Sequence, residues 1–312
     1  MKQKIKTDML KLKDSFCKCV LPTKQDNLSQ IILKIIYLLA LILIITFFVF
    51  VAVYFSNINA EQSLLSNNKK ILAEYSESNN GGLKKALNYF KKQNSDFSGW
   101  ITIENTDLSA PIYQTEDNKF YKTHNQLKNE NKSGTLFFDC NDTFLEKDKN
   151  LIIYGKNEKQ LFSCLQNYKS KYYYLENPII KLSTFDSTDN YVIFAAFIIN
   201  SKKEDDNGYI FNYKKSSFKS SEQFDDWYNE ITERSLYTTN ISVSMDDSFI
   251  TLVTDSAEFD GAKLVIMARK LESSEKSIYL TANVNKIPRY PQIYYDTKGI
   301  KNPFNKENNY VS

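Results

Sequence analysis

The chain has 312 residues, of which 42% are hydrophobic and 25% charged, with only 8 Gly, 6 Pro and 4 Cys. This composition excludes a collagen-like, low-complexity or disulfide-stapled protein and is typical of a globular one. The net charge of +3 is unevenly distributed: residues 1–34 carry eight Lys and three Asp, which leaves a net charge of −2 for residues 35–312. No nucleic acid partner is therefore expected for the larger part.

The first predicted element is an apolar helix over residues 35–55. This run has 21 residues and contains no charge, Gly or Pro. At about 1.5 Å per residue, it matches the roughly 30 Å hydrocarbon core of a bilayer. A cleavable signal peptide would have a shorter apolar stretch and small residues at the cleavage site. We therefore expect an uncleaved transmembrane helix, with the membrane as its partner.

The flanking lysines predict the orientation of that helix. Lys24 and Lys34 lie shortly before the apolar run, and Lys-rich flanks stay in the cytoplasm. Residues 1–34 are thus expected to be a cytoplasmic basic leader of a single-pass plasma-membrane protein. Residues 56–312 are expected outside the cell.

The four cysteines are divided between the two sides. Cys17 and Cys19 lie on the inner side, where lipidation and metal binding are alternatives, but two thiols without further ligands favour plain reduced cysteines. For Cys140 and Cys164 a disulfide is permitted outside the cell but not required. We do not predict one, because the sequence does not place their Cα atoms within roughly 7 Å. The single His and the scattered carboxylates lack ligand spacing, so no metal and no cofactor is expected.

The outer part begins with a polar stretch over 56–82, which we interpret as a partly helical stalk or linker. A short lid helix follows over 83–90, because Leu83, Ala86, Leu87 and Phe90 fall on one helical face. The pattern then changes to short strand-like runs bounded by polar clusters. These runs cover residues 99–103, 133–138, 150–154, 179–183, 191–199, 248–254 and 264–268. So many short strands predict a closed barrel or a sandwich, mainly β with a few peripheral helices.

One longer helix is predicted among the strands, over 220–237. Serines open it, acidic residues fill its first turns and Arg234 lies near its end, as the helix dipole favours. Its apolar stripe is expected to pack on the strands rather than to form a ligand site. The stripe consists of Phe224, Trp227, Tyr228 and Ile231. Residues 271–312 form a Tyr-rich C-terminal extension, for which wrapping the domain and contacting a partner remain alternatives.

Five segments in serial order resemble class B sortases, the membrane-anchored transpeptidases of Gram-positive cell surfaces. They are NSDFSGWITI at 94–103, YKTH at 121–124, GTLFFD at 134–139, LIIYG at 151–155 and RSLY at 234–237. The resemblance covers about residues 85–270. It implies an eight-stranded sortase β-barrel over 83–270, with an added helix before the strand that carries the nucleophile.

The resemblance also implies three functional positions. In the family, a Cys closing a T-L-S-T-C strand attacks the sorting signal, a His in Y-G-H-N moves protons, and an Arg on the next strand stabilises the oxyanion. Here TLVTD ends in Asp255, YGKN carries Lys156, and GAKLV carries Lys263. A carboxylate is a poor nucleophile towards a peptide, and an ammonium group is not a base near neutral pH. Losing a catalytic nucleophile can cost on the order of 10⁶ in rate, so ordinary sortase turnover is not expected.

Two expectations follow for this site. Asp255 should lie within salt-bridge reach of Lys156 or Lys263 at the partly buried floor of the former groove, because an unpaired buried carboxylate is costly. His124 is the only His, and Cys140 and Cys164 are the only cysteines of the outer part, so a relocated catalyst would have to combine His124 with one of these two thiols. It is not favoured, because His124 lies in a segment where sortases carry a His without catalytic duty.

The sequence leaves three functional hypotheses. The first is a catalytically inactive sortase B-like protein, anchored in the membrane, that binds a sorting-signal-like peptide or a surface-assembly partner. The alternative is an active transpeptidase or hydrolase that works without the usual Cys or from a relocated site. The third is a decayed product without a role, against which the uninterrupted anchor and complete strand pattern count.

Overall fold

The structure is a computed structural model that describes residues 20–76, 81–145, 148–206, 208–272, 275 and 279–304. Contacts divide the chain into two units, residues 1–64 and residues 65–312. The second unit contains the barrel together with part of the predicted stalk and the described part of the predicted extension. The expected domain boundaries at 82–83 and 270–271 stay predictions. Cys17 and Cys19 lie outside the described residues.

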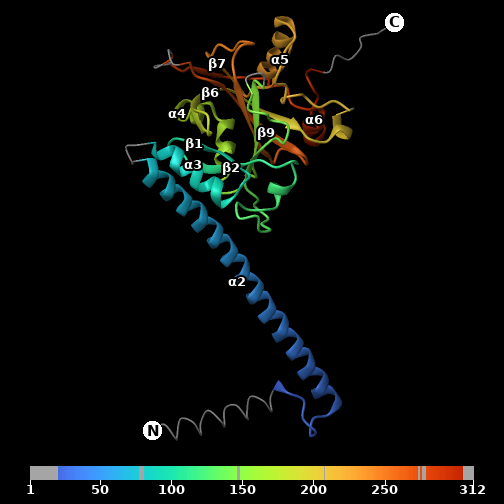
Figure 1. Ribbon diagram of the computed structural model, residues 1–312. Coiled ribbons are helices and arrows are strands. Elements are labelled where there is room, and N and C mark those ends of the chain that lie inside the picture. Colours follow the sequence, from blue (N-terminus) through green and yellow to red (C-terminus); the bar gives the residue numbers. More distant parts are fainter. Residues whose placement is uncertain are drawn as a thin grey trace, which may run out of the picture. The chain divides into compact units, whose positions relative to one another are not determined.

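The dominant element of the N-terminal part is helix α2, Leu28–Ser76 (Figure 1). It begins at a capping box in which the Asn27 side chain accepts from Gln30 N and the Gln30 side chain accepts from Asn27 N, both at 2.9 Å. The predicted run 35–55 lies inside this helix and is long and apolar enough to cross a membrane, which makes it a candidate span. The stalk is helical up to Ser76 because no Gly or Pro interrupts it.

The C-terminal unit contains the predicted closed barrel, with strands in the order β1-β2-β3-β4-β8-β9-β6-β5. The sandwich alternative is thereby excluded. The barrel strands are β1 Phe97–Ile103, β2 Ser109–Tyr113, β3 Leu136–Phe138, β4 Asn150–Tyr154, β5 Ile179–Ser183, β6 Thr188–Asn200, β8 Phe249–Asp255 and β9 Ala262–Lys270. β7 Tyr237–Thr239 pairs with β10 Ala282–Val284 in a separate small sheet.

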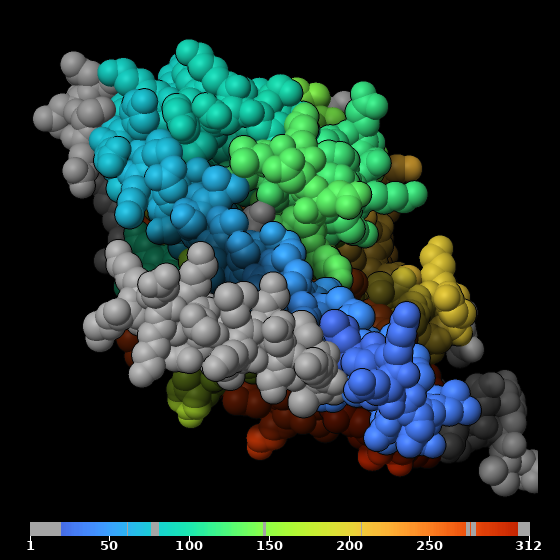
Figure 2. Space-filling model, turned by 90° about the horizontal axis from the view of Figure 1, so that it is seen from below, coloured from blue at the N-terminus to red at the C-terminus, as the bar shows by residue number. Residues whose placement is uncertain are grey.

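Seven helical segments accompany the strands of this unit in the described residues. They are α3 Gly82–Gln93, η1 Phe120–Lys122, η2 Ser163–Lys169, α4 Lys171–Glu176, η3 Lys203–Asp206, α5 Ser221–Arg234 and α6 Gln292–Lys298. The predicted lid helix corresponds to α3, which buries Ala86, Leu87 and Phe90 against the β1 side of the barrel. We call this hydrophobic cluster the α3 core; its other buried members are Phe97, Trp100, Tyr113, Tyr121 and Phe137. The segment between β2 and β3 lies beside α3 in the space-filling view (Figure 2). Asn94, which follows α3, donates to two residues of that segment, Tyr121 and Gln126.

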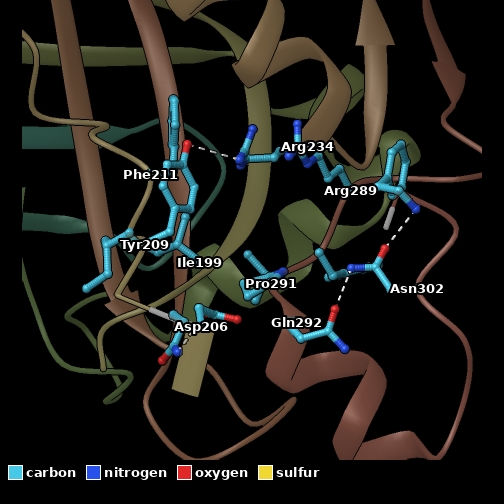
Figure 3. Close-up of a pocket in the computed structure, with 14 residues that line it drawn as sticks. Ile199, Asp206, Tyr209, Phe211, Arg234, Arg289, Pro291, Gln292 and Asn302 are labelled. Atoms are coloured by element: carbon cyan, nitrogen blue, oxygen red, sulfur yellow. Dashed lines mark hydrogen bonds between the residues drawn. The ribbon is translucent and has the colours of Figure 1, made fainter. Parts of the chain in front are cut away.

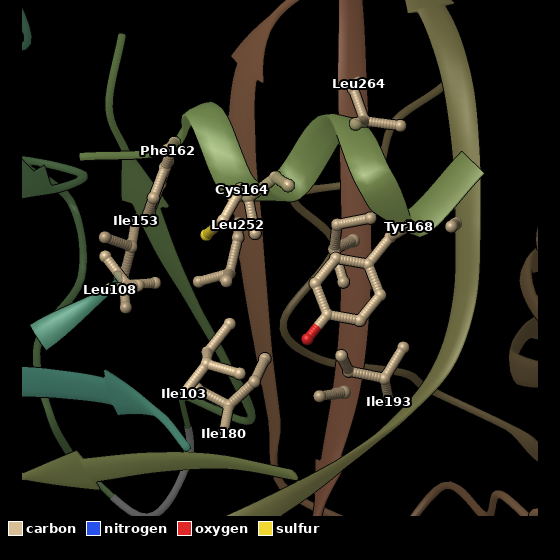
Figure 4. Close-up of a cluster of buried hydrophobic side chains, with 14 of the residues drawn as sticks. Ile103, Leu108, Ile153, Phe162, Cys164, Tyr168, Ile180, Ile193, Leu252 and Leu264 are labelled. Atoms are coloured by element: carbon tan, nitrogen blue, oxygen red, sulfur yellow. The ribbon is translucent and has the colours of Figure 1, made fainter. Parts of the chain in front are cut away.

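Besides the α3 core, the barrel has an inner and an outer hydrophobic core, which the alternation of side chains along the strands separates. Ile250 and Leu252 of β8 face the barrel interior, whereas Phe249 and Val253 of the same strand face outwards. The interior is closed by η2, from which Cys164 and Tyr168 reach into the apolar cluster (Figure 4). Cys164 and Cys140 are both free thiols.

Helix α5 covers the outer core. Phe224, Trp227 and Ile231 are buried there and Tyr228 is partly buried, which confirms the predicted stripe. Ser220 caps the helix by accepting from Gln223 N at 3.3 Å. The helix ends at Arg234, three residues before the predicted end, because Ser235 turns away and donates to the Tyr237 carbonyl at 2.6 Å.

The described part of the C-terminal extension wraps the barrel unit. Strand β10 pairs with β7, and Ile293 N at the start of α6 donates to Asp206 at 3.2 Å. The last turns of α2 also belong to this unit. Ile71, Leu72 and Tyr75 pack on the α3 core, and buried Asn68 donates to buried Gln126 at 2.6 Å.

A buried carboxyl group in the β3–β4 connection predicts a pH dependence of stability. Burial raises the pKa of Asp142 to about 8 from its ordinary 3.8, although the group accepts from Ile152 N at 2.7 Å. In the unfolded chain Asp142 ionises above about pH 4, whereas in the folded chain it stays protonated up to about pH 8. The free energy of unfolding therefore falls as the pH rises from about 4 to 8. Asp142→Asn keeps the acceptor and removes the ionisation. We expect the variant to exceed the native chain in free energy of unfolding at pH 8 by on the order of 2–5 kcal/mol, and by much less at pH 4.

Urea unfolding at the two pH values measures this difference. Asp148→Asn is the matched control, because it removes a neighbouring carboxylate but keeps Asp142 ionisable, so most of the pH dependence should remain. An equal stability difference between the native chain and Asp142→Asn at both pH values would contradict the assignment.

Candidate functional site

The three expected site positions gather at one end of three adjacent strands. Asp255 is the last residue of β8, and Lys263, near the start of β9, stands directly opposite in the antiparallel register. Strand β4 runs parallel to β8 on the other side, and Lys156 follows two residues after its end. The sequence separation of 107 residues between Lys156 and Lys263 is thus closed by the pairing of three strands.

Gly155 fixes the backbone just before Lys156. Its N–H continues the ladder by donating to the Val253 carbonyl at 3.2 Å. A Cβ atom at this position would stand 2.8 Å from Phe162 and still closer to Leu136, so any larger residue would force these two buried side chains to shift. The Lys156 carbonyl then accepts from Phe162 N at 3.1 Å. Lys156 therefore starts from a rigid point at the rim of the barrel.

Asp255 and Lys263 form an ion pair, as expected for one of the two lysines. Their side chains are 55% and 33% exposed, so the pair lies at the surface and not at the partly buried floor that we expected. The reason is the register: Asp255 closes β8 on its outward face, beyond the last core position. An exposed pair of this kind contributes about 0–1 kcal/mol to stability.

Lys156 takes another direction. Its ammonium group donates to the carbonyl of Lys132 in the segment before β3. The structure therefore brings together Asp255 and Lys263, whereas Lys156 links the end of β4 to a neighbouring loop.

Several site residues were not found from the sequence. Gln166 of η2 donates to the Asp255 carbonyl at 2.8 Å, and Lys169 of the same segment pairs with Glu258 at 2.5 Å. The hydroxyl of Thr254 is buried without a hydrogen-bond partner among the described residues. Only the pairing of η2 with the β8 end reveals these neighbours, since no local motif marks them.

A charged network lies beside Tyr154 at the end of β4. The Asp139 carboxylate accepts from Lys214 at 2.9 Å and from the Tyr154 hydroxyl at 2.8 Å. Burial opposes ionisation, but these bonds and the N–H of Asn141 hold the pKa of Asp139 well below its usual range. This part of the site thus presents a stable carboxylate and a stable ammonium group.

The relocated catalyst finds no support in the geometry. His124 stacks on Phe120 with ring centroids 4.0 Å apart, and its Nδ1 lies 2.9 Å from the Phe120 carbonyl oxygen. Burial raises the pKa of the Cys164 thiol to about 11, and desolvation together with Asp139 raises that of Cys140. Because the thiolate is the nucleophile, neither thiol is activated. Among the residues that the structure describes, no group of three or more His, Cys, Asp or Glu is arranged to hold a metal ion.

No family model matches the chain. A curated relative does: sortase B of Listeria monocytogenes is 32% identical over 186 residues, which span 59% of this chain and 72% of that protein. The chain belongs to the sortase B family. The sortase B of Clostridium perfringens agrees in structure, with a TM-score of 0.53 and 26% identity over 59% of this chain and 99% of that one.

A second solved sortase B supports the same fold. The Staphylococcus aureus sortase B–substrate complex has a TM-score of 0.58 and 19% identity, covering 70% of this chain and 97% of that one. The predicted family and the predicted sortase B barrel are therefore confirmed.

Proposed function

We propose that this sortase B family member binds a sorting-signal-like peptide or surface protein without turning it over. The proposal rests chiefly on Asp255, which occupies the position at the strand end that holds the attacking Cys in class B sortases. Its carboxylate is paired with Lys263. Lys156 and Lys263 stand in the positions of the His and the Arg.

Three chemical arguments support inactivity. A carboxylate that attacks an amide forms an anhydride, which is more reactive than the starting amide, so the step reverses. An ammonium group at position 156 has no lone pair with which to accept a proton. The two outer thiols have raised pKa values and cannot replace the missing nucleophile.

Peptide binding is proposed because the barrel of the family is preserved in this chain. A family structure contains a substrate bound to the S. aureus sortase B, and the same barrel is complete here. The apolar helix α2 and its Lys-rich flank support a single-pass anchor in the plasma membrane, with the N-terminus in the cytoplasm and the barrel outside. A cell-surface tether would keep the groove close to newly exported proteins.

The test uses the full chain in nanodiscs with fluorescent LPxTG-like and NPQTN-like peptides. Fluorescence anisotropy measures binding, and mass spectrometry measures cleavage or transfer. We expect saturable binding of one peptide class and no product. Asp260→Ala is the matched control for Asp255→Ala, because Asp260 also forms an exposed ion pair, with Lys202, in the β8–β9 connection.

Two outcomes would overturn the proposal. Product formation that disappears in Asp255→Ala but persists in Asp260→Ala would establish an active enzyme that works without a Cys. Absence of both binding and product for all peptides would remove the peptide-binding role.

A further inference from the structure

A cavity of about 260 Å³ lies between α5, the end of β6 and the C-terminal segment (Figure 3). One wall comes from residues 289–304, beyond the region 85–270 in which the chain resembles class B sortases. The cavity is therefore built by this chain's own extension. Its volume is slightly below the 300–1,000 Å³ usual for drug-sized ligands, so it suits a small molecule.

Two guanidinium groups line one side of the cavity, those of Arg234 and Arg289. Arg234 is only 7% exposed, and its Nη1 is held by the carbonyl and carboxylate of Glu230, both at 2.9 Å. Its Nη2 reaches the Tyr209 hydroxyl at a long 3.4 Å, and its Nε has no partner among the described residues. Burial lowers the pKa of Arg234, and the charge of Arg289 adds to this effect.

Arg289 is also held by a glutamate of α5. Its Nη1 donates to Glu233 at 3.0 Å, which leaves Nε and Nη2 without a partner in the described part of the chain. Arg289 is thus fixed through Nη1, and Arg234 through Nη1 and the long bond from Nη2, and each retains donors for a further acceptor. Two neighbouring guanidinium groups with spare donors favour an anion, and their planar forks match a carboxylate.

The remaining walls are apolar or already satisfied. Phe211 stacks under Arg234 with 4.6 Å between the guanidinium carbon and the ring centroid, and Ile199 and Pro291 add apolar surface. The carboxylate in the cavity, Asp206, already accepts from Asn200 at 2.7 Å and from Ile293 N at 3.2 Å. It therefore anchors the extension and is not a free site for an ammonium group.

We propose that this cavity binds a small molecule in which one carboxylate is attached to an apolar or aromatic group. The carboxylate would accept from Arg234 and Arg289, and the apolar group would contact Phe211, Ile199 and Pro291. The proposal is independent of peptide binding at the Asp255 end of the barrel, so either can fail alone.

The probe pair is hydrocinnamate and its neutral amide, measured by saturation-transfer difference NMR on the full chain in nanodiscs, with empty nanodiscs as the blank. We expect the acid to bind at least about tenfold more tightly than the amide, as charge-assisted hydrogen bonds imply. Arg289→Gln should weaken binding of the acid about tenfold or more and leave the amide unchanged. Lys298→Gln, on nearby α6, is the control for loss of a surface cation and should have no effect.

Arg234→Lys serves as a second variant, because it keeps the buried charge and removes the planar fork; its thermal midpoint is checked first. A tripeptide with a free C-terminal Phe carboxylate distinguishes two sources of the carboxylate. If the tripeptide competes with hydrocinnamate, the cavity accepts the C-terminus of a peptide; if it does not compete, the cavity accepts a free small acid. Equal binding of acid and amide, no binding of the acid, or full binding by a folded Arg289→Gln chain would overturn the proposal.

Discussion

A chain that combines Lys156→His, Asp255→Cys and Lys263→Arg is expected to cleave a sorting-signal peptide at a measurable rate. The native chain should give no product above the blank. The strand ends that carry the three positions are adjacent and rigidly spaced by the β4-β8-β9 pairing. A thiolate nucleophile and an imidazole base then supply the chemistry that carboxylate and ammonium groups lack. We expect the triple variant to exceed the blank rate by about a hundredfold or more, a small part of the roughly 10⁶ that a nucleophile can contribute.

The control for this experiment is a cysteine at a matched position outside the proposed site. Asp260→Cys, combined with the same two lysine substitutions, introduces the thiol five residues further along in the β8–β9 connection. It should remain at the blank. If the folded triple variant that contains Asp255→Cys also stays at the blank, the groove has lost more than its three functional side chains. The argument that a preserved barrel implies peptide binding would then be weakened.

A chain that begins at residue 81 is expected to be markedly less stable than one that begins at residue 65. The shorter chain lacks Ile71, Leu72 and Tyr75, which pack on the α3 core, and the buried hydrogen bond of Asn68 to Gln126. Partial burial of three large apolar side chains plus one buried hydrogen bond amounts to about 3–5 kcal/mol. For a domain of this size, that corresponds to a fall in thermal midpoint of about 6–20 °C.

Differential scanning fluorimetry of the two fragments measures this difference. Point variants of the full chain provide a matched comparison: Leu72→Ala removes a core contact, whereas Glu74→Ala changes an exposed side chain of the same helix. Leu72→Ala should reproduce part of the loss and Glu74→Ala none. Identical midpoints for both fragments would show that the last turns of α2 contribute nothing to the barrel unit.

Local patterns predicted most of the barrel. Strands β4 and β5 have the bounds expected from the sequence, β6 and β9 extend the expected runs by a few residues, and β8 is shifted by one residue from the expected run. Strand β2 was missed because Pro111 interrupts a run of only five residues. The three-residue strands β7 and β10 carry too short a pattern for periodicity to reveal. Positions 156, 255 and 263 were found from the order of the segments that resemble class B sortases, because each position lies at or next to the end of a recognisable strand.

The sequence by itself determined the family resemblance, the apolar helix and the identity of the side chains at positions 156, 255 and 263. Each of these is encoded in a run of neighbouring residues. Only the tertiary structure decided that Asp255 pairs with Lys263 at the surface while Lys156 turns to the Lys132 carbonyl. It also decided that the C-terminal extension closes a cavity over Arg234. These features depend on strand register and on contacts between segments far apart along the chain, which no local pattern specifies.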